Sequence, residues 1–258
     1  MQQIDGGPVD PADLQALALT GLGHFTTMLV QDGRVRGLDL HLARLVADAR
    51  ALFDADLDED VIRQRIRSAI ADEPAAVVVR VTIFDPALTL THPGADAHPR
   101  ILVSPRPAPS ASPAPMRVRT TSFGRQTPEI KHTGLFGSLY QRRVAQRAGF
   151  DDALFVDDDG ILSEGPTWNI GFIAGDEIVW ADGDALPGVT RALLADVAGG
   201  RTAAVRVDEL AGMDAAFATS SGVGIRPIAS IDESAWPTDH PAFERLRAAY
   251  AAIPGTPL

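Results

Sequence analysis

The sequence predicts an α+β protein of two domains, and three observations support this prediction. Runs of β-branched residues alternate with stretches of helical periodicity, and 45% of the 258 residues are apolar, which is enough for a sizeable core. A proline-rich segment, SPRPAPSASPAPM, interrupts the chain, and its alternating prolines disfavour both a helix and a central strand. We therefore expect a small N-terminal α+β domain over residues 1–103, a linker over 104–116 and a larger C-terminal α+β domain over 117–258.

The N-terminal domain is expected to combine a sheet with two helices. The Asp32-Gly33 pair lies between two apolar runs, which is typical of a hairpin turn, and the helical stretches show apolar residues at intervals of three and four. The expected elements are a hairpin with its first strand over 25–30, helices over 39–53 and 59–71, and strands over 75–84 and 100–103.

The C-terminal domain is expected to consist of short strands, many joined as hairpins, and three helices. Gly149 lies where the first of these helices should stop, because glycine readily adopts the left-handed conformation that ends helices. The expected strands cover residues 116–121, 153–156, 161–163, 169–173, 177–180, 202–207 and 215–219, and the expected helices cover 133–148, a short stretch ending at 199–200, and 243–252.

Charge and composition exclude several classes of function. The formal net charge of −11 argues against a nucleic-acid partner, and no apolar run approaches the roughly 20 residues that a membrane span needs. The absence of cysteine excludes disulfides and thiolate chemistry, and the six histidines show no metal-ligand spacing, so we expect no metal site. We expect a cytoplasmic protein. Lys131 is the only lysine, and any chemistry of a side-chain primary amine must therefore occur there.

Four features could carry chemistry, and each also has a plain structural interpretation. Lys131 could be a solvated charge, and Glu164, in LSEGPTWNIGF, an ordinary exposed acid. The segment LPGVTR places backbone N–H groups and a threonine hydroxyl at a helix start, which suits an anion, although a simple loop with a threonine cap is about equally plausible. The turn TSSG after an expected strand offers further hydroxyls, but alone it is better explained as a polar loop.

Together these features resemble the class IV aminotransferases, the fold-type IV enzymes that use pyridoxal phosphate and that include branched-chain and D-amino-acid aminotransferases and aminodeoxychorismate lyase. The resemblance extends from about residue 21 to residue 227. The matching segments, in chain order, are GHFTTMLVQDGRVRGLDLHLARL, IKHTG, GFDDALFVDDDGILSEGPTWNIGF, LPGVTR and SSGVGIRPI. The resemblance implies a two-domain fold with the cofactor in the interdomain cleft, and a homodimer.

The resemblance also implies roles for individual residues. Lys131 would bind the cofactor as a Schiff base and move the proton at the substrate α-carbon, while Glu164 would lie against the pyridine nitrogen and favour its protonated form. The cofactor phosphate would be bound by Arg44, Val189, Thr190, Ser221 and Gly222. Arg44 has a competing interpretation as a solvent-facing arginine of an amphipathic helix.

Some positions depart from the family pattern and leave the substrate open. Phe136 stands five residues after the lysine, where the family often has a tyrosine, and Thr26 replaces a common glutamate. His132 next to the lysine could line the site or be an ordinary packed histidine. For the substrate carboxylate, the candidates are Thr27, Arg80, Trp168 and Arg226.

The prediction is a pyridoxal-phosphate-dependent aminotransferase that moves an amino group between an amino acid and a 2-keto acid by a ping-pong mechanism. Two alternatives stay open. The first is a lyase of the aminodeoxychorismate lyase type, which releases pyruvate by β-elimination and is favoured by the FTT and KH segments. The second is a non-catalytic homologue that acts as a binding module.

Overall fold

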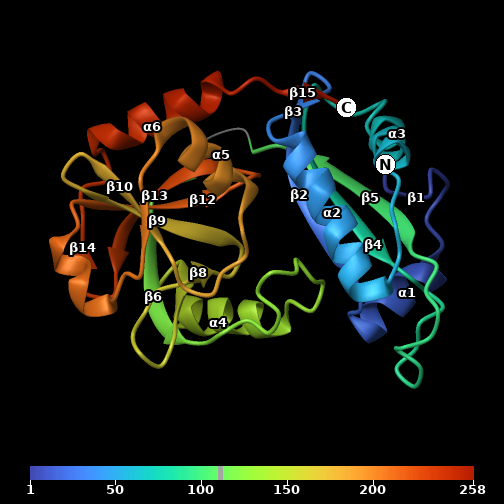
Figure 1. Cartoon of the computed structure of the whole chain (residues 1–258), viewed down its shortest axis with the longest axis horizontal. Coiled ribbons are helices and arrows are strands. Elements are labelled where there is room, and N and C mark those ends of the chain that lie inside the picture. Colours follow the sequence, from blue (N-terminus) through green and yellow to red (C-terminus); the bar gives the residue numbers. More distant parts are fainter. Residues whose placement is uncertain (110–112) are drawn as a thin grey trace. The chain divides into compact units, whose positions relative to one another are not determined.

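A six-stranded sheet and a nine-stranded sheet, each with its own helices, make up the protein and confirm the α+β class (Figure 1). The structure is a computed structural model that describes residues 1–109 and 113–258. The chain divides into two units. Unit 1 comprises Met1–Ala108, Ile130–Gly134 and Pro254–Leu258, and unit 2 comprises Pro109–Glu129 and Leu135–Ile253.

This division differs from the predicted domains in where the lysine lies. The sequence analysis placed Lys131 in the C-terminal domain, whereas its contacts place it in unit 1. The physical reason is backbone pairing: Phe25 N donates to Lys131 O at 2.9 Å, and Thr133 N donates to Gly23 O at 2.8 Å. A segment distant in sequence thus pairs with a strand of unit 1.

The sheet of unit 1 is antiparallel and carries two helices on one apolar face. Its strand order is β1 (Gln3–Ile4), β5 (Arg100–Pro107), β4 (Ala76–Phe84), β2 (His24–Gln31), β3 (Arg34–Val35) and β15 (Thr256–Pro257). Alternate residues of the central strands, among them Met28, Val79 and Val81, pack with Leu42 and Leu45 of α2 (Leu38–Phe53). Helix α3 (Glu59–Ala69) adds Ile62 and Ile66 to this core, so the face toward α2 is closed to solvent.

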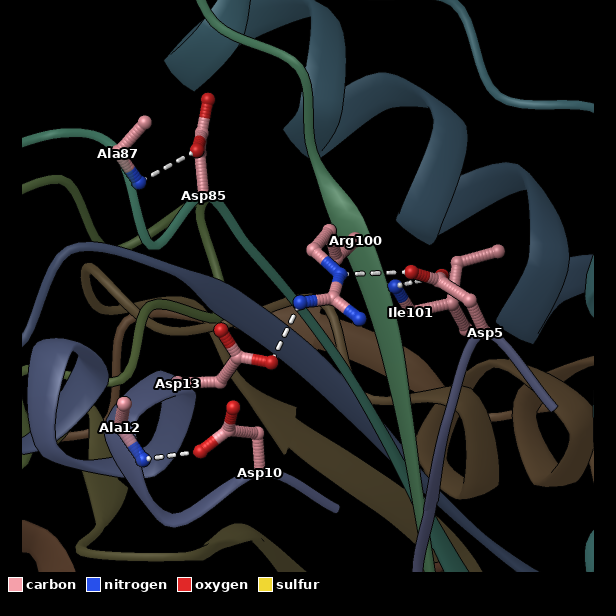
Figure 2. Close-up of polar contacts among 8 residues, drawn as sticks. All are labelled: Asp5, Asp10, Ala12, Asp13, Asp85, Ala87, Arg100 and Ile101. Carbon is pink, nitrogen blue, oxygen red and sulfur yellow. Dashed lines mark hydrogen bonds and ion pairs between the residues drawn. The ribbon is translucent and has the colours of Figure 1, made fainter. Parts of the chain in front are cut away.

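Helix α1 (Pro11–Thr20), which the sequence analysis did not predict, is attached to the sheet through charges (Figure 2). Asp10 caps its start by accepting the Ala12 N–H at 2.9 Å. Arg100 of β5 pairs with Asp13 of the helix and, at 2.7 Å, with Asp5. None of its ten residues is fully buried, which explains why apolar periodicity did not clearly indicate it. Leu14 and Leu17 nevertheless pack, partly buried, against Phe84 and Leu102 of the sheet.

The predicted linker begins inside a strand. Strand β5 continues to Pro107, and Pro105 and Pro107 lie opposite Val79 and Val77 of β4. Strand β1 covers β5 only at Leu102 and Val103, so the following residues form a sheet edge, where a missing proline N–H costs no ladder hydrogen bond. The remainder of the predicted linker includes residues 110–112, which lie outside the described residues.

The sheet of unit 2 is mixed. Its main order is β11 (Arg201–Ala203), β10 (Glu177–Ala181), β9 (Trp168–Ala174), β12 (Ala215–Ser220), β13 (Gly224–Ile231), β6 (Met116–Ser122) and β7 (Asp152–Val156), with β8 (Glu164–Gly165) on β9 and β14 (Ser234–Ala235) on β13. Its helices are α4 (Phe136–Arg147), α5 (Val189–Ala198), α6 (Pro241–Ala252) and the short 3-10 helix η1 (Val207–Gly212). Four expectations need correction. β13 was missed, and α4 begins three residues later than expected. The strand expected over 202–207 ends at Ala203, and residues 161–163 form only isolated bridges instead of the expected strand.

Apolar side chains pack the helices of unit 2 against its strands. Phe217 of β12 contacts Trp180 and Phe243 edge-on, with ring centroids 5.4 and 6.2 Å apart, and this cluster fixes α6. Leu194 of α5 joins the same cluster. Helix α4 packs separately, through Ala145, against β7. Within the described part of the chain, none of the helices has the length and apolar character needed to cross a bilayer.

Candidate active site

Lys131 lies on a short segment that pairs with the start of β2. An antiparallel bridge joins His132 to His24, and the Thr133 hydroxyl donates to the carbonyl of Gly21 at 2.5 Å. On the other side, the Lys131 N–H donates to the buried carboxylate of Asp48, on α2, at 3.1 Å. The backbone of Lys131 is therefore held from two elements of unit 1.

The ring of Phe25 lies below two cations. Lys131 Nζ is 5.0 Å from the centroid of this ring, and the Arg80 guanidinium carbon is 3.6 Å from it. Burial, followed by the nearby Arg106, lowers the pKa of Arg80. Thr27 is directly opposite Arg80 in the β2–β4 pairing, so their side chains share a face of the sheet. The structure thus brings together Lys131 and two predicted substrate residues, Arg80 and Thr27.

Arg44 lies on α2, one turn after the buried His41. Thr26 Oγ1 and His41 Nδ1 are 2.6 Å apart, so the threonine that departs from the family pattern has a defined partner. Burial, reinforced by the positive charges of Arg44 and Lys131, lowers the pKa of His41 to about 3. His41 is therefore neutral near pH 7, and both cations are close enough to act on the same imidazole.

Glu164 is a buried carboxylate of unit 2 and not the exposed acid of the plain interpretation. It is 4% exposed in β8, and its Oε1 accepts a hydrogen bond from Arg125 at 3.1 Å, with the two side chains 5% and 9% exposed. Burial lowers the pKa of Arg191, against the attraction of Asp182 and Glu164, which raises it. The sequence analysis assigned no role to Arg125 or Arg191. Arg191 is the arginine of the LPGVTR segment, and no sequence pattern indicated Arg125.

The LPGVTR segment forms the start of α5. Among the described residues, no side chain caps this helix start, which follows Gly188, and Thr190 is 2% exposed. A Cβ atom on Gly188 would lie 1.8 Å from Asn169 Oδ1, so the loop can approach β9 only because glycine is there. An uncapped helix start offers backbone N–H groups to an anion, as the sequence predicts for Val189 and Thr190.

The turn after β12 lies next to this helix start. The hydroxyls of Thr190 and Ser221 are 3.2 Å apart, and Gly222 follows in the same turn. Thr219, the strand residue two positions before Ser221, is 2% exposed, and its hydroxyl has no hydrogen-bond partner among the described residues. The sequence analysis named Thr219 only as part of the turn. A buried hydroxyl without a partner beside other hydroxyls and a helix start is what a phosphate site needs.

Two predicted substrate residues are accounted for by other contacts in unit 2. Trp168 is 7% exposed, belongs to the core and donates its indole N–H to Asp152 at 2.8 Å. Arg226 Nε donates to the carbonyl of Ala114 at 2.6 Å. Phe136, in contrast, is 81% exposed at the start of α4 and stacks on Tyr140, with centroids 5.9 Å apart.

Each unit by itself holds groups that suit part of a phosphorylated aldehyde cofactor. Unit 1 has the single side-chain primary amine and the guanidinium of Arg44, and unit 2 has a buried carboxylate and hydroxyls at a helix start. The unpartnered Thr219 hydroxyl and the tight glycine at position 188 are the observations that favour a bound phosphate. Among the described residues, no group of three metal-ligating side chains occurs.

Comparison with known proteins agrees with this chemistry. Residues 23–231 match the sequence profile of the family described as "Amino-transferase class IV". Among curated proteins, no significant match was found.

Solved structures of similar fold are aminotransferases. The branched-chain aminotransferase from Thermoproteus uzoniensis with norvaline is 20% identical, with a TM-score of 0.83 over 97% of this chain and 93% of that chain. A hypothetical aminotransferase from Mycobacterium tuberculosis in its PLP-bound form is 22% identical, with a TM-score of 0.83 over 98% of each chain. The fold IV-transaminase from Curtobacterium pusillum is 26% identical, with a TM-score of 0.80 over 95% of this chain and 88% of that chain.

Proposed function

Because the chain belongs to the class IV aminotransferase family and is thus a pyridoxal-phosphate-dependent transaminase, we propose that it moves an amino group between an amino acid and a 2-keto acid by a ping-pong cycle. The observation that carries the proposal is the fixed position of Lys131, the only side-chain primary amine of the protein, against the strand β2. The cofactor cleft and the residues that would bind the cofactor stay predictions.

We propose, from the family resemblance, which residues bind the cofactor. The guanidinium of Arg44, the N–H groups of Val189 and Thr190, and the turn at Ser221 and Gly222 would bind its phosphate through charge-assisted hydrogen bonds. Thr219 is added to this set because its buried hydroxyl has no other partner among the described residues. When bound, the cofactor supplies an electron sink for the bond that breaks at the substrate α-carbon.

Glu164 and Lys131 would perform the proton chemistry. Glu164 would lie against the pyridine nitrogen and hold a proton there, and Arg125 at 3.1 Å favours the ionised carboxylate that this role needs. The Lys131 amine would take the proton from the substrate α-carbon and deliver it to the C4′ carbon of the cofactor. The Phe25 ring below Nζ limits where the amine can move.

The substrate carboxylate would bind on the face of the unit 1 sheet that carries Arg80 and Thr27. Arg80 is a partly buried guanidinium over the same ring as the lysine, and such a cation suits a carboxylate. Trp168 and Arg226 remain candidates of second rank, because the observed contacts to Asp152 and Ala114 already occupy their polar atoms. We further propose, from the family resemblance, a homodimer in the cytoplasm.

The test is a half-reaction followed by a full one. The purified enzyme, loaded with pyridoxal phosphate, is given amino acids alone and then together with a keto acid. The proposal expects one equivalent of keto acid product per enzyme without an acceptor, and turnover once an acceptor is present. Continuous release of pyruvate without an acceptor would instead identify the lyase, and no reaction with any amino donor would favour a binding module.

A further inference from the structure

A buried aspartate and a buried histidine lie behind the lysine segment in unit 1. Asp48, 5% exposed, is on α2, and its Oδ2 accepts the N–H of Lys131 at 3.1 Å. His24 is fully buried, and its Nδ1 is 3.9 Å from the same oxygen. Neither side chain has a part in the chemistry proposed above.

The helix that carries Asp48 also carries two other groups of this region. His41, Arg44 and Asp48 are spaced by three and four residues, which places them on one face of α2. His41 contacts Thr26 of β2, and Asp48 contacts the lysine segment that pairs with β2. One helix face therefore sets the spacing between the predicted phosphate-binding arginine and the reacting amine.

His24 does not balance the charge of Asp48 near neutral pH. Desolvation lowers the pKa of His24 to about 4, so the imidazole is neutral, and neither ring nitrogen has a hydrogen-bond partner among the described residues. A separation of 3.9 Å is too long for a hydrogen bond. Asp48 accepts the backbone N–H of Lys131 and is only 5% exposed, so water screens its effect on the lysine segment poorly.

We propose that Asp48 is a positioning residue for Lys131, which fixes the lysine backbone through its N–H and supplies a counter-charge to the amine, with His24 as its neutral buried neighbour. The inference rests on the proposed function in that Lys131 is the reacting amine. The cations of the region would by themselves disfavour a protonated amine, and Asp48 offsets them. The charged or titratable groups around the lysine are His41, Arg44 and Asp48 of α2, His24 of β2, Arg80 of β4 and the adjacent His132.

The test uses the protein without cofactor and exploits its single lysine. Reductive methylation with ¹³C-formaldehyde labels Lys131 and the chain-terminal amine, and the Lys131 signal is identified by its loss in Lys131→Arg. In Asp48→Asn we expect the apparent pKa of the Lys131 amine, followed by NMR, to fall by about one unit, because an adjacent opposite charge is lost. In Asp48→Ala the Lys131 amide proton should also exchange at least about tenfold faster, since its acceptor is gone.

Asp85→Asn is the matched control. Asp85 is a buried aspartate of unit 1, 6% exposed, that accepts the N–H of Ala87 at 2.8 Å (Figure 2). It also accepts the N–H of His98 at 2.6 Å, and neither of these donors belongs to the lysine segment. We expect its substitution to leave both Lys131 readouts at their wild-type values. Equal Lys131 titrations in Asp48→Asn, Asp85→Asn and the wild type would overturn the proposal.

A readout on the wild type keeps the proposal testable if a variant does not fold. The Lys131 amide of the unmodified protein should exchange more slowly than an unprotected amide, and exchange at the unprotected rate would overturn the proposal. Because no cofactor is present, a protein that never binds pyridoxal phosphate but shows these shifts would refute the proposed function alone.

Discussion

The two units position their functional groups in different ways. In unit 1, Lys131 comes from a segment about a hundred residues after β2 in sequence, and it is held by strand pairing and by a buried carboxylate of α2. In unit 2, Thr190 lies at a helix start and Ser221 in a turn, and each of these two segments has its own local sequence pattern. The position of the lysine thus depends on long-range pairing, whereas the hydroxyls of unit 2 lie on locally formed segments.

The charged groups around the lysine of unit 1 also differ from those around the buried carboxylate of unit 2. Unit 1 surrounds its amine with cations and with two histidines, His24 and His41, that burial keeps neutral near pH 7. Unit 2 pairs its buried carboxylate, Glu164, with Arg125. The comparison indicates that substitutions in unit 1 should change the state of the amine, and substitutions in unit 2 should change the binding and the protonation of the cofactor.

The largest effect is expected for Lys131→Arg, which keeps the positive charge of unit 1 but removes the primary amine. Proton transfer at the substrate α-carbon should lose its base, and kcat should fall by at least about 1,000-fold, within the range typical of a lost acid–base group. Steady-state assays with the best amino donor measure this change. Activity within tenfold of the wild type would show that another group moves the proton.

Next in size is Glu164→Gln, the corresponding change in unit 2. Losing the negative charge beside the pyridine nitrogen should lower kcat by about 100-fold, on the order of one active-site electrostatic interaction, with a smaller effect on cofactor affinity. The control is Glu177→Gln, whose exposed carboxylate pairs with Arg201 at 3.0 Å in the same unit. If both variants retain wild-type rates, Glu164 has no role in the reaction.

A smaller effect is expected for the phosphate ligands, one from each unit. Arg44→Gln removes a charge-assisted hydrogen bond and should weaken pyridoxal phosphate binding by roughly 10- to 100-fold, while Thr190→Val should weaken it by about tenfold. Equilibrium dialysis of the two single variants and the double variant gives their coupling. Strictly additive losses would argue against one phosphate bound by both units.

The last prediction concerns stability rather than activity and sharpens the electrostatic contrast. The pKa of His24 is lowered to about 4 in the folded protein, and burial similarly lowers that of His41 to about 3, so between these values and 6.5 the unfolded chain binds more protons. The free energy of unfolding should therefore fall as pH drops below 6.5, by up to about 1.4 kcal/mol per pH unit for each histidine.

Urea unfolding from pH 6.5 to 4.5 measures this slope, and His24→Leu should make it shallower. All three tryptophans belong to unit 2, so their fluorescence follows that unit, whereas far-ultraviolet circular dichroism follows both. An unchanged slope in His24→Leu would mean that folding does not lower the pKa of His24.

What the sequence could predict follows the same contrast between local and long-range structure. The LPGVTR and SSG segments are local, so the helix start at Val189 and the turn at Ser221 were expected where they are found. The strands around the Asp32-Gly33 turn and the helices α2 and α3 were also expected, because their apolar periodicity is strong.

The parts that could not be predicted depend on contacts between distant residues. Helix α1 has no fully buried residue, and it is attached through Arg100 and through the partly buried Leu14 and Leu17, so periodicity gave no clear sign of it. The pairing of Lys131 with β2, the contact of Asp48 with the lysine and the pairing of Arg125 with Glu164 have no local sequence pattern. The core packing of Trp168 and its bond to Asp152 were likewise not foreseen, and its place near the substrate stays a prediction.

The most direct test of the central claim is covalent trapping of the cofactor. The protein is mixed with pyridoxal phosphate, reduced with borohydride, digested and mapped by mass spectrometry. We expect one phosphopyridoxyl group per chain, attached to Lys131, and no stoichiometric attachment in Lys131→Arg. A wild-type protein that carries the group only at its terminal amine, or not at all, would contradict the assignment of Lys131 as the cofactor lysine.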